Sequence, residues 1–510
     1  MAAHAGRPLT RTRARHDGRA FARLRALLAR VPRTAWVCAL VAVLNATAWG
    51  VIVPAFQIPD EQSHYAYTEY FVQHGRPPAT ATRDTYSSSE QAALDALKWR
   101  EIQFQSEQET IWSAREQRDM RTALAQPANR RDGNGAAREV GGEPPLYYAL
   151  QAVPYALGSS GTVLDRLQLM RLVSALLAGA TVLFVFLFLR ELLPAAPESW
   201  RVGALGVAFL PMFTFMSSGV NSDALLYAGA AALFAALARG FRRGLTRKRA
   251  VAIGAALGTA LMAKFNAFGL VPGTVVALLV LGARREGALR PRALALPALA
   301  LAVAVAPLLV EMALNASVWD RPVVGASASS NFGTSALHPS LGMGASYLWQ
   351  FYLAPLPGMT HYISAAPFYE YWERGFVGWF GWLDGRFRPL VYALALVPLT
   401  ALAVLAAATL VRARRRVRAR FGELLSYALL ALGLMAFIAL ASYISYLRYS
   451  QSIAQTRYLF PLLALYGGGL ALAARGAGRR WAPVLGTAIV VLAIAHTLFS
   501  ELLVIARYYA

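Results

Sequence analysis

The chain has 510 residues, of which 57% are hydrophobic and 15% charged, and its formal net charge is +23. Since soluble domains carry about 25% charged residues, this composition excludes an ordinary soluble domain and favours a membrane protein. The Lys and Arg residues form short clusters between apolar runs and carry no nucleic-acid-binding motif, so no nucleic acid is expected as a partner. The single cysteine, Cys38, excludes a disulfide framework and a thiolate metal site.

Apolar runs recur along the chain, and about 20 such residues suffice to cross the hydrocarbon core of a bilayer. They predict an all-α polytopic integral membrane protein with about 11 transmembrane helices. The least regular pair is the fifth and sixth, because Lys264 and Asn266 interrupt it. The predicted spans are 36–56, 167–189, 202–219, 222–238, 250–266, 268–283, 293–313, 389–411, 424–447, 457–474 and 482–505.

The loop charges predict how these helices are oriented. With the N-terminus in the cytoplasm, the inner segments hold 30 of the 50 Lys and Arg residues but five of the 27 acidic residues. Such a basic excess is typical of cytoplasmic loops. We therefore expect a basic cytoplasmic tail at 1–35, a polytopic membrane domain at 36–505, and an extracytoplasmic C-terminus. The Ala-, Arg- and Leu-rich composition indicates a bacterium, and hence its inner (plasma) membrane.

Two predicted extracytoplasmic segments, 57–166 and 314–388, are too long to be simple connections, and loops of that length are usually functional. In the first, Asp60–Gln73 is expected to form an amphipathic helix on the membrane surface. Residues 88–126 are typical of a polar helix, and a second, apolar surface helix is expected from Glu143 to about 157. The second segment is rich in aromatic residues up to Phe387.

The stretch Asp60-Glu61-Gln62-Ser63-His64 follows the first span directly. Ionisable groups at a membrane boundary are costly and are often functional. Asp60 and His64, four residues apart, share one side of a helix, and a carboxylate near an apolar boundary can act as a general base. The alternative is that Asp60 is an N-cap residue and His64 an interfacial side chain. Glu61 then either takes part in the chemistry or has no role in it.

Two cations near the predicted outer face are candidates for binding an anion. Lys264 interrupts an apolar run, where it binds an anion or extends to the headgroups. Arg457 opens a span, and its planar guanidinium suits a lipid phosphate, although interfacial anchoring is the alternative.

Further polar residues on the same predicted face complete the candidate site. Glu143 precedes the second surface helix, and Asn221 and Asp223 cap the turn between the third and fourth predicted spans. Each of the three residues either belongs to a site or only favours a helix N-terminus. Trp382 and Asp384 belong to the aromatic segment, which is either an interfacial belt or a platform for lipid and sugar. A divalent cation stays an open alternative, since the carboxylates and histidines have no diagnostic metal-ligand spacing.

The order of these motifs resembles that of the GT-C superfamily of membrane glycosyltransferases, which includes protein O-mannosyltransferases and aminoarabinose or arabinosyl transferases. The acidic pair after the first span is similar to their first-loop acidic motif, and Glu143-Pro144-Pro145-Leu146-Tyr147-Tyr148 is similar to the signature of their second surface helix. Across roughly 36–475 the chain most resembles an uncharacterised family of predicted bacterial membrane proteins allied to that superfamily. Its motifs here are Pro59-Asp60-Glu61 with His64, Asn221-Ser222-Asp223, Phe380-Gly381-Trp382-Leu383-Asp384 and Arg457-Tyr458-Leu459-Phe460-Pro461.

The superfamily resemblance implies an inverting glycosyltransferase with a polyprenyl-phosphate-linked sugar donor and an extracytoplasmic glycan, lipid or protein acceptor. It implies that Asp60 deprotonates the acceptor, Glu61 positions Asp60 or contacts the sugar, and Lys264 and Arg457 hold the donor phosphate. Fold resemblance alone does not fix the reaction. The alternatives are a transporter or flippase of lipid-linked saccharides, a polymerase or ligase that uses lipid pyrophosphates, and a scaffold in envelope assembly.

Overall fold

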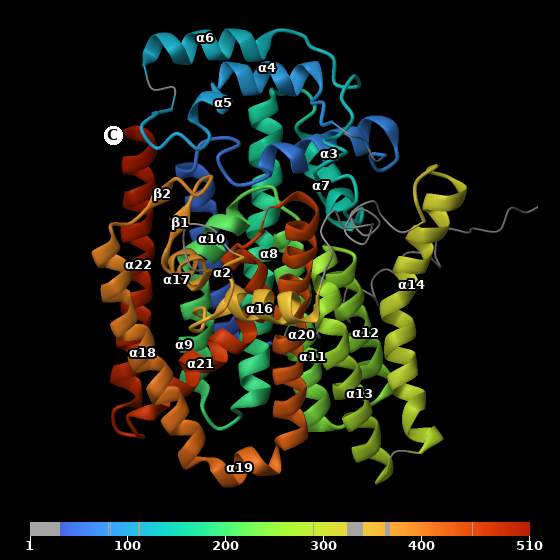
Figure 1. The fold of residues 1–510 in the computed structure, drawn as a ribbon, viewed down its shortest axis with the longest axis vertical. Helices are drawn as coiled ribbons and strands as arrows, with labels where there is room; N and C mark the ends of the chain where they lie inside the picture. Colours follow the sequence, from blue (N-terminus) through green and yellow to red (C-terminus); the bar gives the residue numbers. More distant parts are fainter. Residues whose placement is uncertain are drawn as a thin grey trace, which may run out of the picture.

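The structure is a computed structural model. It describes residues 31–79, 81, 83–110, 113–288, 290–323, 340–362, 368–450 and 452–510. Residues 1–30 of the predicted basic tail lie outside the described residues, as do 324–339 and 363–367 of the predicted second outer segment. The described part is an all-α, multi-pass membrane protein with one short β-hairpin, as the apolar periodicity of the sequence predicts (Figure 1).

Nine helices in the described residues are long and apolar enough to cross a membrane. Three of them begin with a 3₁₀ turn, namely η1 (Phe265–Leu270), η2 (Pro291–Leu294) and η3 (Thr456–Leu462). The nine helices are α2 (Arg33–Ile52), α8 (Val163–Leu192), α11 (Asp223–Arg243), α13 (Val271–Glu286), α14 (Ala295–Ser317), α18 (Pro389–Arg412), α20 (Phe421–Tyr449), α21 (Leu463–Gly476) and α22 (Ala482–Tyr509).

The two remaining predicted spans are helical but irregular. The run predicted at 202–219 is a bent pair, α9 (Pro197–Ala208) and α10 (Pro211–Ser218), whose axes differ by 57°. The expectation of one continuous helix there is wrong, because Pro211 lacks the N–H that would continue the backbone hydrogen bonds. The run predicted at 250–266 forms α12 (Arg247–Leu261), which ends before Lys264. Lys264 itself has extended backbone geometry and precedes η1.

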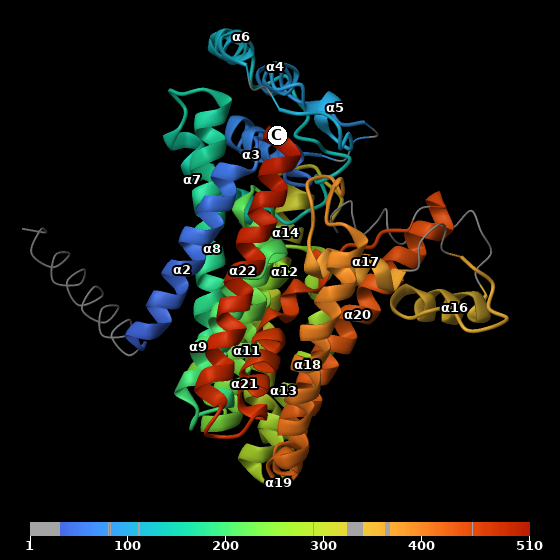
Figure 2. The same ribbon diagram turned by 90° about the vertical axis from the view of Figure 1, so that its left-hand side faces the viewer.

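The spanning helices run roughly parallel, with the short α19 (Arg414–Ala419) at one end and the C-terminus at the other (Figures 1 and 2). α8 packs between α2 and α11, α12 packs on α14, and α18 packs on α21. Small residues allow some helices to approach closely. A Cβ added to Gly203 of α9 would lie 2.3 Å from the carbonyl oxygen of Gly467 in α21, so only glycine fits there.

The first long connection forms a layered cap over the end of the bundle that lies uppermost in Figure 1. Its helices are α3 (Glu61–His74), α4 (Ser88–Ala96), α5 (Trp99–Ile102), α6 (Ala114–Ala125) and α7 (Leu146–Leu157). The two predicted surface helices correspond to α3 and α7. The continuous polar helix expected at 88–126 is wrong, because the chain breaks at Lys98 and Phe104, both in the left-handed region (φ 52° and 61°).

Tertiary contacts hold this broken segment in place. The Trp99 indole N–H donates to the carbonyl of Phe56 at 3.1 Å, which ties α5 to the start of the connection. The Arg507 guanidinium in α22 donates to the carbonyls of Gln105 and Gln108, each at 2.6 Å. The cap is therefore fixed to both the first and the last helix of the bundle.

The second long connection holds α16 (Leu341–Tyr352), α17 (Phe368–Val377) and the hairpin of β1 (Trp379–Phe380) and β2 (Gly385–Arg386). The strands are antiparallel, with Trp379 opposite Arg386. Gly381 and Leu383 in the turn have positive φ (61° and 65°). The Thr456 hydroxyl of η3 donates to the carbonyls of Tyr371 and Trp372, so α17 lies against the start of η3. This contact brings the aromatic segment beside Arg457.

Candidate active site

Asp60 occupies the position before the first turn of α3, but its side chain does not cap the helix. Its backbone is left-handed (φ 66°), and its carboxylate makes no bond to the α3 backbone. Instead, the Arg457 guanidinium donates to Asp60 Oδ2 through Nη2 at 2.5 Å. The Asn221 amide donates to the carbonyl of Pro59 at 3.2 Å and so fixes this turn. The N-cap alternative for Asp60 is therefore not what the geometry supports, and Asn221 holds the turn that presents Asp60.

Glu61, the next residue, faces the opposite way. Its carboxylate receives two bonds from the Arg171 guanidinium, at 2.6 and 2.8 Å, and two from the backbone N–H groups of Phe56 and Val220. Arg171 also donates to three backbone carbonyls between residues 50 and 54. Both side chains are buried, and their hydrogen-bonding capacity is filled. Glu61 thus ties α3 to α2, α8 and the start of α11, which suits a residue that positions Asp60.

Asp60 belongs to a cluster of charges that we call the Asp60 cluster, made of the buried Asp223 and Arg457 and the partly buried Asp60, Glu143 and Lys264. The Lys264 ammonium lies 3.0 Å from Asp223 Oδ1 and 3.7 Å from Glu143 Oε1. Arg457 Nε lies 3.8 Å from Asp223 Oδ2. The cluster thus joins the first connection, the start of α11, the α12–η1 junction and η3.

The Asp60 cluster is not saturated with hydrogen bonds. Within the described residues, Arg457 Nε and Nη1 donate no hydrogen bond, and the Asp223 carboxylate has ion pairs with Lys264 and Arg457 but accepts no well-aligned hydrogen bond, although all four atoms are buried. Buried polar atoms are nearly always satisfied in folded proteins, so a group of exceptions needs an explanation. A ligand that supplies acceptors for the Arg457 donors would provide one.

His64 and Glu143 meet through a tyrosine on the same side of α3. The Tyr148 hydroxyl lies 2.8 Å from His64 Nδ1 and donates to Glu143 Oε2 at 2.7 Å. The His64 ring also stacks at 5.9 Å on the Tyr148 ring. His64 is thus in contact with the cluster through Tyr148 and Glu143, and its distance to the Glu143 carboxylate is 4.0 Å.

The local electrostatics keep Asp60 ionised and His64 neutral. Burial alone would raise the pKa of Asp60, but the nearby Arg457 charge and hydrogen bond outweigh it and hold that pKa below its usual value. Burial lowers the pKa of His64, and the Lys264 charge adds to this against the pull of Glu143. At neutral pH the site therefore presents an ionised carboxylate with two cations beside it.

Trp382 and Asp384 are placed outside this cluster. Asp384 Oδ2 accepts two bonds from the Arg507 guanidinium, at 2.5 and 2.9 Å, and its Oδ1 accepts the backbone N–H of Trp382 at 2.8 Å. The Trp382 ring lies edge-on to Trp99 and Phe104 of the cap. These two residues join the hairpin to the cap and α22. The same hairpin turn contributes Gly381 and Leu383 to a small cavity that Arg457 also lines.

The described residues contain no group of three or more His, Cys, Asp or Glu side chains arranged to hold a metal. The Asp60 and Asp223 carboxylates are each paired with a cation, Asp60 with Arg457 and Asp223 with Lys264.

Several residues at the site escaped the sequence analysis. Arg171 lies within the predicted span at 167–189, and a charge inside a span is itself a signal of function or pairing. Tyr148 lies in the motif that was singled out, but its link to His64 depends on how α3 and α7 pack. Ser63 donates to the Glu139 carboxylate, a contact across 76 residues that no local pattern predicts.

Comparison with known proteins decides the family. Residues 43–466 match the family described as "Predicted membrane protein (DUF2142)". The chain belongs to the DUF2142 family. This confirms the family recognised from the sequence motifs. A search of curated protein sequences found no match to this DUF2142 chain.

Solved structures similar to this DUF2142 protein include ArnT from Cupriavidus metallidurans in the apo state, with 14% identity and a TM-score of 0.45 over 87% of this chain. An oligosaccharyltransferase from Archaeoglobus fulgidus, tethered to an acceptor peptide with the NVT sequon, is similar with 10% identity and a TM-score of 0.42 over 93% of this chain. The apo form of that enzyme gives 11% identity and a TM-score of 0.39. The chain spans 60% of the length of the ArnT chain and 55% of the peptide-tethered oligosaccharyltransferase chain.

Proposed function

We propose that this DUF2142 protein is an inverting glycosyltransferase that moves a sugar from a polyprenyl-phosphate donor to an extracytoplasmic acceptor. The observation that carries the proposal is the unsaturated Asp60 cluster, in which two buried donors of Arg457 make no hydrogen bond to any described residue. A phosphate oxygen is a strong acceptor for a guanidinium group. Lys264, beside Asp223, adds a second cation to the same space.

An apolar cavity supports a lipid-linked donor. It has a volume of about 310 Å³ and lies between α17 and the η3–α21 segment, where Trp372, Phe376 and Leu463 are among its walls. Thr456 lines both this cavity and the smaller one that contains Arg457. A prenyl chain would bind in the apolar cavity because burial of apolar surface is favourable. Its phosphate would then lie near the Arg457 guanidinium.

In the proposed reaction the acceptor hydroxyl oxygen attacks the anomeric carbon from the side opposite the phosphate. The new C–O bond forms as the bond to the phosphate oxygen breaks, and polyprenyl phosphate leaves with the electron pair. The hydroxyl proton passes to the Asp60 carboxylate. Arg457 and Lys264 stabilise the charge that grows on the leaving phosphate, which is an electrostatic contribution to the transition state.

The pairing of Asp60 with Arg457 has a consequence for the base. Without a bound donor, the hydrogen bond and charge of Arg457 lower the pKa of Asp60, so Asp60 is a weak proton acceptor. When a donor phosphate shares the Arg457 charge, the pKa of Asp60 rises toward the operating pH, where a general base is most effective. Donor binding would thus activate the base.

We also infer that the Asp60 cluster and the cap face the extracytoplasmic side of a bacterial inner membrane. The end of the bundle opposite the cap carries the basic loops, among them Arg242, Arg243 and the α19 arginines, and basic loops are retained in the cytoplasm. On this basis residues 36–505 form one membrane domain, with the N-terminus inside and the C-terminus outside.

The test is a transfer assay in membrane vesicles supplied with a panel of polyprenyl-phosphate hexoses and pentoses labelled in the sugar. Wild-type protein is expected to move label from the lipid fraction to a lipid-insoluble or second lipid product. Asp60→Asn should lower that rate about 10²–10⁴-fold, the usual contribution of a general base. The exposed Asp119→Asn in α6 serves as the matched control and should keep the wild-type rate.

Failure of every panel member with wild-type protein, or transfer by Asp60→Asn at the wild-type rate, would contradict the proposal. A flippase would leave the sugar on its lipid carrier in this assay. A polymerase or ligase would consume a lipid pyrophosphate instead of the monophosphate donors.

A further inference from the structure

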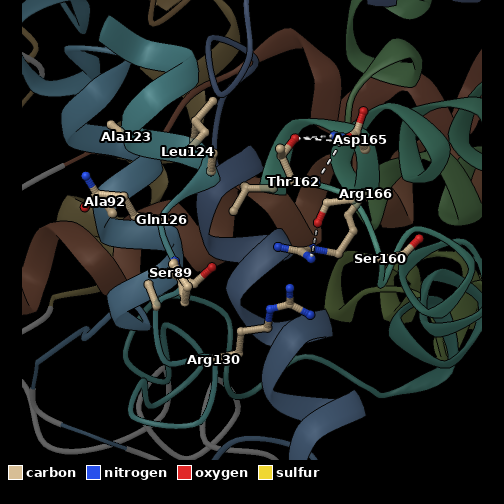
Figure 3. Close-up of a pocket in the computed structure, with 15 residues that line it drawn as sticks. Ser89, Ala92, Ala123, Leu124, Gln126, Arg130, Ser160, Thr162, Asp165 and Arg166 are labelled. Carbon is tan, nitrogen blue, oxygen red and sulfur yellow. Dashed lines mark hydrogen bonds between the residues drawn. The ribbon is translucent and has the colours of Figure 1, made fainter.

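A second cavity lies away from the Asp60 cluster, between the α4 and α6 layer and the turn that joins α7 to α8 (Figure 3). Its volume is about 480 Å³, within the range of about 300–1,000 Å³ that is typical of small-molecule sites. Gln126, Ala128 and Ser160 on its rim are exposed, so the cavity opens to solvent. Alanines of α4 and α6 form one wall and leave the space free.

Two arginines define the chemistry of this cavity. Figure 3 shows the guanidinium groups of Arg130 and Arg166 turned toward the same space. Arg166 is 1% exposed and is held by the Tyr65 hydroxyl, 2.9 Å from its Nε, and by the Gly161 carbonyl, 3.1 Å from its Nη1. Arg130 donates from Nη1 to the Ser159 carbonyl at 3.3 Å and is partly exposed. One guanidinium is thus fixed by its surroundings and the other is free to adjust.

Two arginines and one acidic side chain line the cavity, so its positive charge is only partly neutralised from within. Asp165 is the acidic residue among its lining side chains, and its carboxylate accepts the backbone N–H and the hydroxyl of Thr162 in a capping box at the start of α8. Glu69 and Glu90 line a smaller adjoining cavity that also includes Arg130. Burial raises the pKa of both glutamates, while the charges of Arg166 and Arg130 act against this shift at Glu69.

We propose that this cavity binds the anionic group of a saccharide, a sugar carboxylate or a sugar phosphate. The planar guanidinium groups match either anion with paired hydrogen bonds. Ser89 and Ser160 in the walls add hydroxyl groups that suit the neutral hydroxyls of a sugar ring. The residues that line this site come from 89–130 of the first connection, from the α7–α8 turn and from the start of α8.

The cavity and the Asp60 cluster lie on different sides of one helix. Tyr65, which holds Arg166, follows His64 in α3, and α3 begins next to Asp60. An extended acceptor held by its anionic group at the arginines is therefore anchored to the same helix that presents the base. The role of the cavity as an acceptor subsite rests on the proposed function, whereas its anion binding does not.

The experiment is a saturation-transfer NMR titration of the full chain in phosphatidylcholine nanodiscs. The probes are D-glucuronate, glucose 1-phosphate, glycerol 3-phosphate and neutral D-glucose. We expect one or both anionic sugars to bind, and to bind more tightly than glycerol 3-phosphate or glucose. Arg130→Gln should raise the Kd of the bound sugar at least about tenfold, as expected for loss of a charge-assisted hydrogen bond. Ala123→Leu, which fills the cavity and leaves its charges intact, should also weaken binding.

Arg131→Gln is the matched control, because Arg131 is adjacent and exposed, donates to Gln73 and does not line the cavity. An unchanged Kd in Arg130→Gln, no binding of either anionic sugar, or equal binding of glucose would overturn the proposal. Glycerol 3-phosphate binding as tightly as the sugars would overturn it in favour of a lipid headgroup. The titration is repeated with Asp60→Asn. Binding there, in the absence of any transfer by wild-type protein, would reject the proposed function and leave the anion site standing.

Discussion

Two ion-pair clusters lie on either side of the start of α3, and they differ in how completely their hydrogen bonds are filled. The Glu61–Arg171 pair is fully buried, and its donors and acceptors are taken up by each other and by the surrounding backbone. The Asp60 cluster is only partly buried, yet its buried members Asp223 and Arg457 keep atoms without hydrogen-bond partners in the described part of the chain. Adjacent carboxylates in one motif therefore have different surroundings: Glu61 is fully hydrogen-bonded within the fold, whereas Asp60 belongs to a cluster with unfilled hydrogen-bonding capacity.

The difference follows from the backbone at Asp60. Its left-handed conformation (φ 66°) turns the Asp60 side chain toward η3, while the first turn of α3 directs Glu61 toward α8. A left-handed non-glycine residue is uncommon and costs free energy, so it is found mainly where the surroundings require it. Here the left-handed backbone directs the neighbouring carboxylates of Asp60 and Glu61 toward different partners, Arg457 and Arg171.

The largest expected difference between the two clusters is in how much each contributes to the free energy of unfolding. Glu61→Gln should lower the free energy of unfolding by about 3–5 kcal/mol, because it leaves the Arg171 charge buried without its partner. Asp60→Asn should cost less, since Asp60 makes one bond to Arg457 and is partly exposed. Denaturant titration of the purified protein measures both, with the exposed Glu101→Gln as control. Equal losses for the two variants would remove the distinction.

A smaller effect is expected for donor binding. Lys264→Met should weaken the affinity for polyprenyl phosphate by about tenfold or more, because one charge-assisted contact to the phosphate is lost. Lys264→Arg, which keeps the charge, should retain most of the affinity. Titration of each variant with polyprenyl phosphate in nanodiscs checks this. If Lys264→Met bound the lipid like wild type, Lys264 would serve Asp223 and Glu143 alone.

The smallest effect concerns pH. The pKa of His64 is lowered in the folded state, mainly by burial, whereas an unfolded histidine has a pKa of about 6.5. Below about pH 6.5 the unfolded state therefore binds more protons, and stability should fall as the pH is lowered further. His64→Asn should show a shallower decline in melting temperature between pH 7.5 and 5. Identical slopes in both proteins would show that His64 is not the group responsible.

Much of the architecture was predictable because it depends on local patterns. The apolar runs located the spanning helices, and the predicted surface helix at Asp60–Gln73 differs from α3 by one residue at each end. The long polar helix at 88–126 was not predictable as three pieces, because contacts from Trp99 and from Arg507 in α22 impose the breaks. Intrinsic helix propensity yields to such tertiary contacts.

The site was predictable as a set of residues but not as a geometry. The distribution of loop charge predicted that Asp60, Asp223, Lys264 and Arg457 lie on one face of the membrane. These residues do lie together in the structure, although Asp60 and Arg457 are 397 positions apart in the sequence. The division of labour between Asp60 and Glu61 was not predictable, since it depends on a backbone conformation that an N-cap rule does not foresee. The loop charges placed Asp384 on the same face, but Asp384 pairs with Arg507 of α22 and lies outside the Asp60 cluster.

The central claim is that the unpartnered donors of Arg457 receive the phosphate of a polyprenyl lipid. Native mass spectrometry of the protein extracted directly from its membrane tests this without knowledge of the sugar or the acceptor. The account predicts that wild-type protein carries polyprenyl phosphate or its glycosylated form, that Arg457→Gln loses this lipid, and that the exposed Arg388→Gln keeps it. Equal amounts of polyprenyl phosphate on wild-type and Arg457→Gln protein, or none on either, would contradict the account.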